Sequence, residues 1–224
     1  YLVDYRSFTK WKANNTTNPW VRIVLTSPAS PDTIGIYNHN FNEVGGTIKL
    51  QHDSDDNDVW TDMETITPNG TKPIMVVIDT PVSSTKFRLF FDTPTLEPEC
   101  AIIFLGVAIE FPYPPESPAI PFEESIRATI EISEAGHNLG SVISHFPLRI
   151  NQTFKNFTRT FFDTYYKPFW INHGRYLIPF FYGWDLVNRP DEIFFVTLDE
   201  GSTFRETLTV LSLMRCIVAC RANS

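Results

Sequence analysis

A proline-rich stretch, EFPYPPESPAIPFEES (residues 110–125), constrains the organisation of the chain more than any other feature. Its five prolines are Pro112, Pro114, Pro115, Pro118 and Pro121. Because proline lacks a backbone N–H and has a fixed φ, neither a helix nor a central strand can run through this stretch. We therefore expect an extended, semi-rigid linker over residues 112–122, joining a domain over 1–111 to a domain over 123–224.

The residues before the linker alternate apolar and polar side chains in short runs separated by turns. Strand-like runs cover residues 20–27, 32–38, 46–53, 72–80, 85–93 and 101–111. β-Branched and aromatic residues, which suit a pleated surface, are frequent in these runs. Several short strands without helical periodicity between them predict an antiparallel sandwich or jelly roll.

The residues after the linker add one helix to the same pattern. Strand-like runs cover residues 125–136, 176–184, 192–198 and 204–219. Aromatic residues recur every three to four positions from Phe154 to Tyr165, which predicts a helix with one aromatic face. We expect Pro168 to break or kink its last turn and Gly174 to end it. The predicted fold class is mainly β, with two β-sandwich or jelly-roll-like domains, the second containing this helix.

The charge of the chain argues against two classes of partner. Its 26 acidic residues outnumber 18 Lys and Arg, which gives a net charge of −8. Nucleic acids and anionic membranes are bound by clustered basic residues, and the sequence has no such cluster. No apolar run approaches the roughly 20 residues of a membrane span. We expect neither nucleic-acid binding nor membrane insertion.

No pattern of catalytic or cofactor-binding residues stands out. The five histidines lack the spacing of zinc peptidases, and neither a nucleophile elbow nor a glycine-rich phosphate loop occurs. A hydrolase on a β scaffold is an alternative, but no constellation of residues in the sequence supports it. We predict a protein that is not an enzyme and that uses no cofactor.

The acidic run DSDDND is the strongest candidate for a metal site. Asp53, Asp55 and Asn57 occupy alternate positions, which is close to the spacing of a calcium-binding loop. Asp58, however, stands where such a loop needs glycine, and both flanks resemble strands rather than helices. The alternative is a hairpin turn whose Asp and Asn side chains bond their own backbone. We favour the turn, with Asp53, Asp55 and Asn57 as the calcium candidates.

Candidate ligand-binding residues lie on either side of this run. His39 and Asn40 belong to an Asn-His-Asn cluster that combines polar groups in a turn. Trp60 offers a ring that could stack on a sugar, although core packing is the alternative for this residue.

The second half contains two stretches dense in large rings, FFDTYYKPFW and YLIPFFYGW. They hold more rings than one face of a domain of this size readily buries, and aromatic residues are enriched at interface cores. A core rich in Phe is the alternative. The residues predicted for a partner interface are Phe169, Trp170, Phe180 and Phe181.

Two stretches carry a resemblance to known proteins. The first combines Trp20, an apolar strand that ends in His39 and Asn40, and an S-x-D-x-x-x-W turn from Ser54 to Trp60. It resembles the galactose-binding-like (discoidin-type) β-sandwich found in phage tail and other virion proteins. The second, NHGRYLIPFFYGWDLVNRPDEIFFVTL, is similar to distal-tail-like components of the phage tail tip or baseplate.

This resemblance implies a non-enzymatic structural protein of a tailed phage, made in the host cytoplasm and located in the virion. It would assemble with other tail proteins and with copies of itself in a ring. One alternative is a carbohydrate-binding module for host surface glycans, and another is a capsid decoration protein. The chain departs from sugar-binding members in lacking an Arg-rich or paired-aromatic ligand loop.

Overall fold

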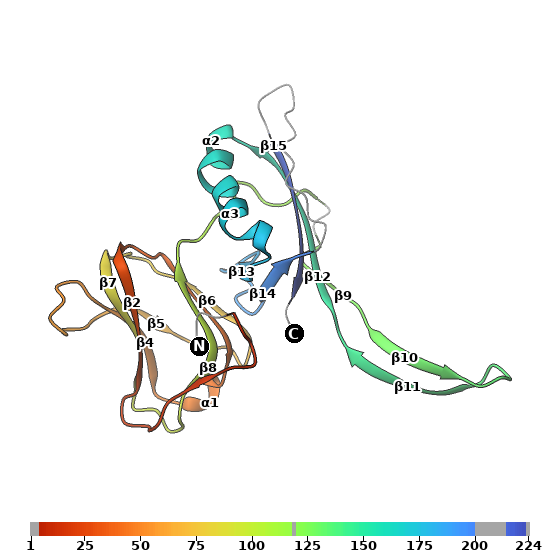
Figure 1. Ribbon diagram of the computed structural model, residues 1–224, viewed down its shortest axis with the longest axis horizontal. Coiled ribbons are helices and arrows are strands. Elements are labelled where there is room, and N and C mark those ends of the chain that lie inside the picture. Colours follow the sequence, from red (N-terminus) through yellow and green to blue (C-terminus); the bar gives the residue numbers. More distant parts are fainter. Residues whose placement is uncertain (1–4, 118–119, 200–213, 223–224) are drawn as a thin grey trace. The chain divides into compact units, whose positions relative to one another are not determined.

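The computed structural model describes residues 5–117, 120–199 and 214–222, of which Lys155 and 214–222 are described by their backbone alone. The chain forms two compact units (Figure 1). The first comprises Tyr1–Ala108 with Phe181–Phe194, and the second comprises Ile109–Phe180 with Phe195–Ser224.

The first unit is built on two antiparallel four-stranded sheets. One sheet has the order β1-β8-β3-β6, formed by β1 (Trp11–Lys12), β8 (Glu99–Gly106), β3 (Thr33–His39) and β6 (Ile74–Val77). The other has the order β2-β7-β4-β5, formed by β2 (Trp20–Ala29), β7 (Ser84–Asp92), β4 (Thr47–Asp53) and β5 (Thr61–Ile66). A short helix, α1 (Phe41–Val44), follows β3.

The two sheets bury one hydrophobic core. Ile34 and Ile36 of β3 pack into the same buried cluster as Leu50 of β4 and Leu89 and Phe91 of β7. Full burial of each such side chain stabilises the fold by about 1.5–3 kcal/mol. Each of the six strand-like runs before the linker contains a strand, so the predicted sandwich and the mainly β class are confirmed.

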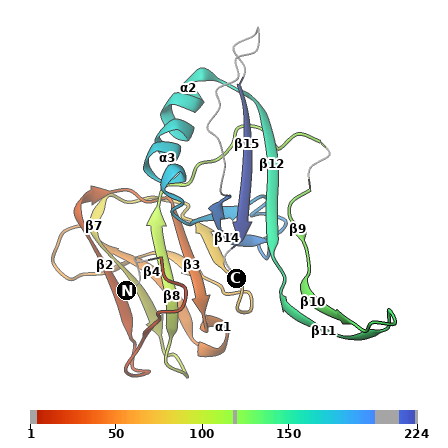
Figure 2. The same ribbon diagram turned by 45° about the vertical axis from the view of Figure 1, so that its right-hand side comes forward.

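The residues after Ala108 contribute a five-stranded sheet and a separate hairpin (Figures 1 and 2). The sheet has the order β13-β14-β15-β12-β9, with bounds β9 (Glu123–Glu124), β12 (Leu148–Phe157), β13 (Phe180–Gly183), β14 (Ile193–Leu198) and β15 (Met214–Ala222). The hairpin consists of β10 (Arg127–Ile132) and β11 (Asn138–His145). Of the predicted run 204–219, residues 204–213 lie outside the described ranges.

The predicted helix is present but begins later than the aromatic spacing indicates. Phe157 still belongs to β12, and the helix starts after Thr158, whose hydroxyl accepts a hydrogen bond from the Phe161 N–H at 3.1 Å. The Phe157 and Phe161 rings lie 5.2 Å apart, so the regular spacing reflects a contact between strand and helix. The helical segments are α2 (Arg159–Phe161), the π-helical η1 (Phe162–Tyr166) and α3 (Lys167–Asn172).

Pro168 does not break this helix. The π-helical turn lies directly before it, and the Lys167 N–H bonds the Phe162 carbonyl five residues earlier. This widened turn accommodates a proline that has no N–H to donate. The helix ends at Asn172, one residue before His173, and a 3-10 turn, η2 (Gly174–Tyr176), follows. The predicted end near Gly174 is thus found.

The proline-rich segment is bound along β12. The Phe111 ring stacks on Phe154 with centroids 4.1 Å apart, and the Glu116 N–H donates to the Thr153 carbonyl at 2.7 Å. The buried Gln152 side chain donates from Nε2 to the Ile120 carbonyl at 2.8 Å. The segment predicted as a linker over 112–122 is therefore attached to the second unit.

Residues 181–194, which the sequence analysis places in the second domain, belong to the first unit. Phe181 packs beside Phe104 of β8, with ring centroids 5.7 Å apart, and covers Gly35 of β3. Lys72 and Asp191 form an ion pair at 3.2 Å. The ring of Phe181 fits there because Gly35 has no side chain.

Within the described ranges, no helix has the length and apolarity that crossing a membrane requires.

The contact between Phe181 and Gly35 gives a test of this arrangement. A methyl group at Gly35 would lie 2.5 Å from Phe181 Cδ2. We expect Gly35→Ala to lower the free energy of unfolding by about 1–3 kcal/mol, because the ring or the strand must move. Denaturant unfolding followed by tryptophan fluorescence measures this change.

Gly106→Ala, in the neighbouring strand β8, is the matched control, because a methyl group there meets no described atom within 4 Å. It should change stability by less than about 1 kcal/mol. Equal destabilisation by the two substitutions would contradict the packing of Phe181 on β3.

Candidate functional site

His39 is held inside the first unit by hydrogen bonds. Its side chain is 4% exposed, and its Nδ1 accepts a hydrogen bond from the Phe41 N–H at 3.1 Å. Its Nε2 therefore carries the proton and donates to the Lys72 carbonyl at 2.8 Å. Burial lowers the pKa of His39, which keeps the ring neutral near pH 7. Both ring nitrogens serve the fold.

Asn40, the neighbouring candidate, is also engaged within the sandwich. Its Nδ2 donates to the Glu97 carbonyl at 3.0 Å, and its Oδ1 accepts a hydrogen bond from the Glu99 N–H at 2.9 Å. These bonds connect the end of β3 to the start of β8. The polar atoms of His39 and Asn40 are thus used to join loops of the first unit.

Core packing, the alternative to sugar stacking for Trp60, does not describe the environment of this residue. It lies just before β5, and the guanidinium carbons of Arg88 and Arg22 lie 4.4 Å and 5.2 Å from its ring centroid. The side chains of Arg22 and Arg88 are cross-strand neighbours on the outer face of the β2-β7-β4-β5 sheet. Trp60 is therefore partly exposed and lies beside two cations. It is about 20 residues from His39 and Asn40 in the sequence, and its ring contacts are with Arg22 and Arg88.

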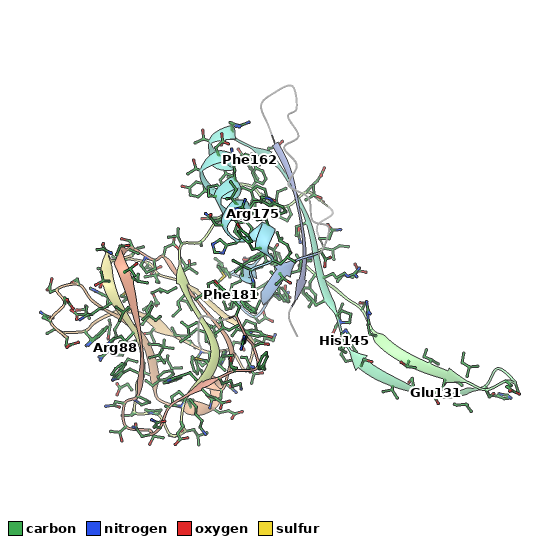
Figure 3. All side chains as sticks on the ribbon, in the orientation of Figure 1. Arg88, Glu131, His145, Phe162, Arg175 and Phe181 are labelled. Carbon is green, nitrogen blue, oxygen red and sulfur yellow. The ribbon has the colours of Figure 1, made fainter. Side chains whose placement is uncertain are left out.

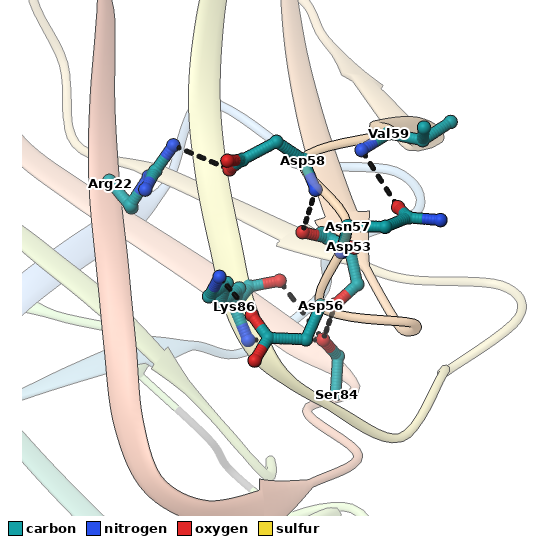
Figure 4. Close-up of polar contacts among 8 residues, drawn as sticks. All are labelled: Arg22, Asp53, Asp56, Asn57, Asp58, Val59, Ser84 and Lys86. Atoms are coloured by element: carbon teal, nitrogen blue, oxygen red, sulfur yellow. Dashed lines mark hydrogen bonds and ion pairs between the residues drawn. The ribbon is translucent and has the colours of Figure 1, made fainter.

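The acidic run forms the hairpin turn between β4 and β5 (Figure 4). Asp53, which is 2% exposed, accepts hydrogen bonds from the N–H groups of Asn57 at 3.2 Å and Asp58 at 2.9 Å. Asn57 in turn accepts a bond from the Val59 N–H at 2.9 Å. Lys86 pairs with Asp56, and Arg22 pairs with Asp58 at 3.1 Å. Side chains of the acidic run are thus engaged in Asx-turn hydrogen bonds and in ion pairs.

These contacts favour the turn over a calcium loop. Across the described ranges, no group of three or more His, Cys, Asp or Glu residues is arranged to hold a metal ion. Asp55, the third candidate, is exposed in the turn. The sequence indicated the turn correctly through residues that bond their own backbone.

The turn makes a prediction about acid stability. Burial raises the pKa of Asp53, but hydrogen bonds from Asn57 and Asp58 and the charge of Lys86 outweigh it, so the pKa lies below its ordinary value. A carboxylate with a lowered pKa stabilises the fold above its ordinary pKa and loses this effect as the pH falls through the folded-state pKa. Asp53→Asn should therefore reduce the Tm near neutral pH and flatten its fall below about pH 4.

Thermal unfolding followed by circular dichroism over acidic to neutral pH measures this effect. Asp55→Asn removes an exposed carboxylate of the same turn and should leave the pH profile of the Tm unchanged. Addition of calcium should leave the Tm of the wild-type protein unchanged. A rise in Tm on calcium addition that Asp53→Asn abolishes would restore the metal interpretation.

The four aromatic residues predicted as an interface are half-buried against their own chain. Phe169 stacks on His173, with centroids 6.0 Å apart, and meets the edge of Phe180 at 5.1 Å. Trp170 lies against Gly174. Phe181 belongs to the first unit, as described above. Intrachain packing therefore uses much of this aromatic surface.

The β10–β11 hairpin carries a group of exposed apolar side chains. It extends beyond the end of β12, and Figure 3 shows its side chains, with Glu131 and His145 labelled, standing free of other elements. Every residue of both strands is exposed, and Val142 reaches 71%. The exposed apolar side chains of the hairpin are Ile130, Ile132, Leu139, Val142 and Ile143. We call this hairpin, residues 127–145, the arm.

Apolar and polar side chains alternate along β10, as in a strand with one buried face. Ala128 pairs with Ile143, and Ile130, which pairs with Ser141, lies on the same face. Thr129 and Glu131 point to the other face, where Thr129 pairs with Val142. An isolated two-stranded hairpin is marginally stable in water, and exposed apolar patches mark partner surfaces. The period-two pattern predicted a strand over residues 125–136, but it gave no sign that the strand would project.

The comparisons with known proteins concern the fold. No family model and no curated protein matches the sequence. Among solved structures, an F5/8 type C domain from Bacteroides fragilis is 17% identical with a TM-score of 0.40, covering 46% of this chain and 76% of that domain. A pectin-binding carbohydrate-binding module is 17% identical with a TM-score of 0.40, covering 50% and 81%.

A family 32 carbohydrate-binding module from C. perfringens, in complex with galactose, is 13% identical with a TM-score of 0.39, covering 46% of this chain and 80% of the module. With TM-scores below 0.5, these similarities carry no argument on function. The sandwich assignment rests on the strand pairing and shared core of the chain itself. The tail-tip role stays a prediction.

Proposed function

We propose that this chain is a non-enzymatic subunit of a symmetric assembly, and that its arm docks on a neighbouring copy of the same chain. The observation that supports this proposal is the exposed arm, which places Ile130 and Ile143 on the same face in solvent. Covering that face would supply the hydrophobic burial that the hairpin lacks.

A second copy suits the arm for two reasons. Within the arm, charges are few, so docking would require little desolvation of ionised groups. Each arm strand also has one backbone edge that the other arm strand does not use, and such an edge can pair with a strand of another molecule. Closed symmetric homo-oligomers are the commonest protein assemblies. From the resemblance noted above, we propose the tail tip or baseplate of a phage virion as the setting.

The arm proposal predicts a face-specific effect on oligomerisation. Ile130→Lys places a charge on the apolar face and should raise the dissociation constant of the oligomer at least about tenfold, since burial of Ile is worth about 1.5–3 kcal/mol. Thr129→Lys adds the same charge at the adjacent position on the opposite face and should have a much smaller effect. Sedimentation velocity on the full chain measures both constants.

Ile143→Lys, on the partner strand, should reproduce the effect of Ile130→Lys. A wild-type chain that stays monomeric at high concentration would contradict docking between copies. Equal weakening by Thr129→Lys and Ile130→Lys would contradict the assignment of the docking face.

Carbohydrate recognition by the first unit is the second candidate function. The observation that favours it is the outer face of the β2-β7-β4-β5 sheet, where Trp20 is 46% exposed and Trp60 is partly exposed. Arg88 supplies a guanidinium beside these rings, and its Nε donates a hydrogen bond to Oε1 of the buried Gln51. Sugar sites combine an aromatic surface with a few fixed polar groups, because a pyranose has apolar faces and hydroxyl edges.

This second function predicts that Trp20 contributes to binding. Trp20→Ala should weaken any saccharide detected by glycan array by about tenfold or more, because stacking of a large ring is lost. Val24→Ala, at an exposed position of the same strand, should leave the affinity unchanged. Isothermal titration calorimetry on the full chain compares the three proteins, and equal affinities would contradict a sugar site on this face.

A further inference from the structure

We propose that the outer face of the β2-β7-β4-β5 sheet binds a sugar that carries a carboxylate, with Arg88 as the residue that holds the anion. This inference rests on the second proposed function, carbohydrate recognition, and names the class of sugar. Two observations support it: the contacts between rings and cations on this face, and the pairing of the cations with carboxylates.

Rings and guanidinium groups contact one another on this face. The residues of this aromatic–guanidinium cluster are Trp20, Arg22, Trp60, Arg88 and Phe90, and Trp20 of β2 lies directly opposite Phe90 of β7. The guanidinium carbon of Arg22 lies 5.0 Å from the Trp20 ring centroid and 5.2 Å from that of Trp60. That of Arg88 lies 4.4 Å from Trp60 and 4.8 Å from Phe90. These cation–π contacts hold both guanidinium groups in place before any ligand arrives.

Two like charges are neighbours in this cluster. Arg22 of β2 lies directly opposite Arg88 of β7, an arrangement that is normally unfavourable in a sheet. Burial and the charge of Arg22 lower the pKa of Arg88, and the charges of Asp62 and Asp58 offset this effect only in part. An anion bound beside the pair would offset the remaining repulsion.

The other cations of the face already have carboxylate partners. Arg22 pairs with Asp58 at 3.1 Å, and Lys49 pairs with Asp62 at 2.8 Å. Lys86 pairs with Asp56 in the acidic turn. Each of these charges is therefore balanced locally.

Arg88 differs from them. Its Nε donates to the neutral Gln51 Oε1 at 2.6 Å, and within the described part of the chain no carboxylate lies within ion-pairing distance of its guanidinium. Gln51 is itself fixed by a hydrogen bond from its Nε2 to Asp62. Arg88 is thus a positioned cation that interacts with the charges of Asp62 and Asp58 at longer range but, within the described ranges, forms no direct ion pair.

A carboxylate on a pyranose ring matches this arrangement in two ways. Guanidinium groups bind carboxylates through charge-assisted and often paired hydrogen bonds. The exposed Trp20 ring, opposite Phe90 in the cluster, offers a flat surface for the sugar ring. Hexuronates and sialates share this chemistry, whereas a neutral hexose lacks the anion.

The test compares sugars that differ in the carboxylate. Methyl galacturonoside is paired with methyl galactoside, and sialyllactose with lactose, so that the two sources of the carboxylate are distinguished. Each probe is titrated into the full-length protein, and affinity is measured by NMR chemical-shift changes and calorimetry. We expect the wild-type protein to bind at least one of the acidic sugars about tenfold more tightly than its neutral counterpart.

Variants of the cluster then assign the anion to Arg88. Arg88→Gln should weaken the acidic sugar about tenfold or more and leave the neutral sugar unchanged, whereas Arg88→Lys should retain part of the preference. Asp58→Asn should strengthen acidic-sugar binding by up to about fivefold, because it frees Arg22 from its carboxylate. Asp58 has a φ of +59°, a conformation that Asn adopts readily, so this variant should fold.

Lys10→Gln is the charge-matched control. It also removes one positive charge, but from an ion pair with Glu99 at the other sheet, and should leave both affinities unchanged. The thermal transition of each variant is measured in parallel to show that it is folded.

The outcomes separate this inference from the function on which it rests. Equal binding of acidic and neutral sugars, or an acidic preference that survives Arg88→Gln in a folded protein, would overturn the role of Arg88 while keeping carbohydrate recognition. Absence of binding to every saccharide would overturn both. Binding of the acidic sugars together with acidic peptides of similar charge, with no dependence on Trp20, would overturn the sugar assignment.

Discussion

The alternation of side chains along β7 is the constraint on which the first unit depends. Phe87, Leu89 and Phe91 point into the core and are fully buried, so the residues between them must face outward. Arg88 and Phe90 are therefore presented to solvent by the same burial that stabilises the sandwich. A shift of one residue in register would exchange the two sets and place a guanidinium in the core. Burial of that unpaired charge would destabilise the fold strongly.

Much of the fold follows from residue patterns that are local in the sequence. Period-two alternation located the strands of the first unit, and the acidic run was correctly interpreted as a turn because Asp53 and Asn57 bond nearby backbone groups. The helix was predicted to start too early, since Phe157 and Phe161 keep helical spacing across a strand-to-helix junction. Periodicity cannot separate a contact along one helix from a contact between two adjoining elements.

The candidate surfaces were harder to predict because they combine distant residues. Arg22 and Arg88 become neighbours only through the pairing of β2 with β7, so no loop in the sequence shows a paired ligand motif. The available signal was weaker: Trp20 and Phe90 are aromatic residues at outward positions of amphipathic strands. His39 and Asn40 formed a conspicuous polar cluster, yet their hydrogen bonds serve loop closure. For the arm, the alternation of apolar residues is the same as in a buried strand.

The attachment of the arm has a mechanical consequence. Its strands continue the β9–β12 pair, with the Ser125 N–H bonded to the Pro147 carbonyl at 3.0 Å at the junction. β12 is also paired with β15 and bonded to the proline-rich segment. A pull on the arm is therefore transmitted through this junction to β12, where the hydrogen bonds to β9, β15 and the proline-rich segment share the load. A subunit held by its arm would carry tension through its central strand and not through a flexible tether.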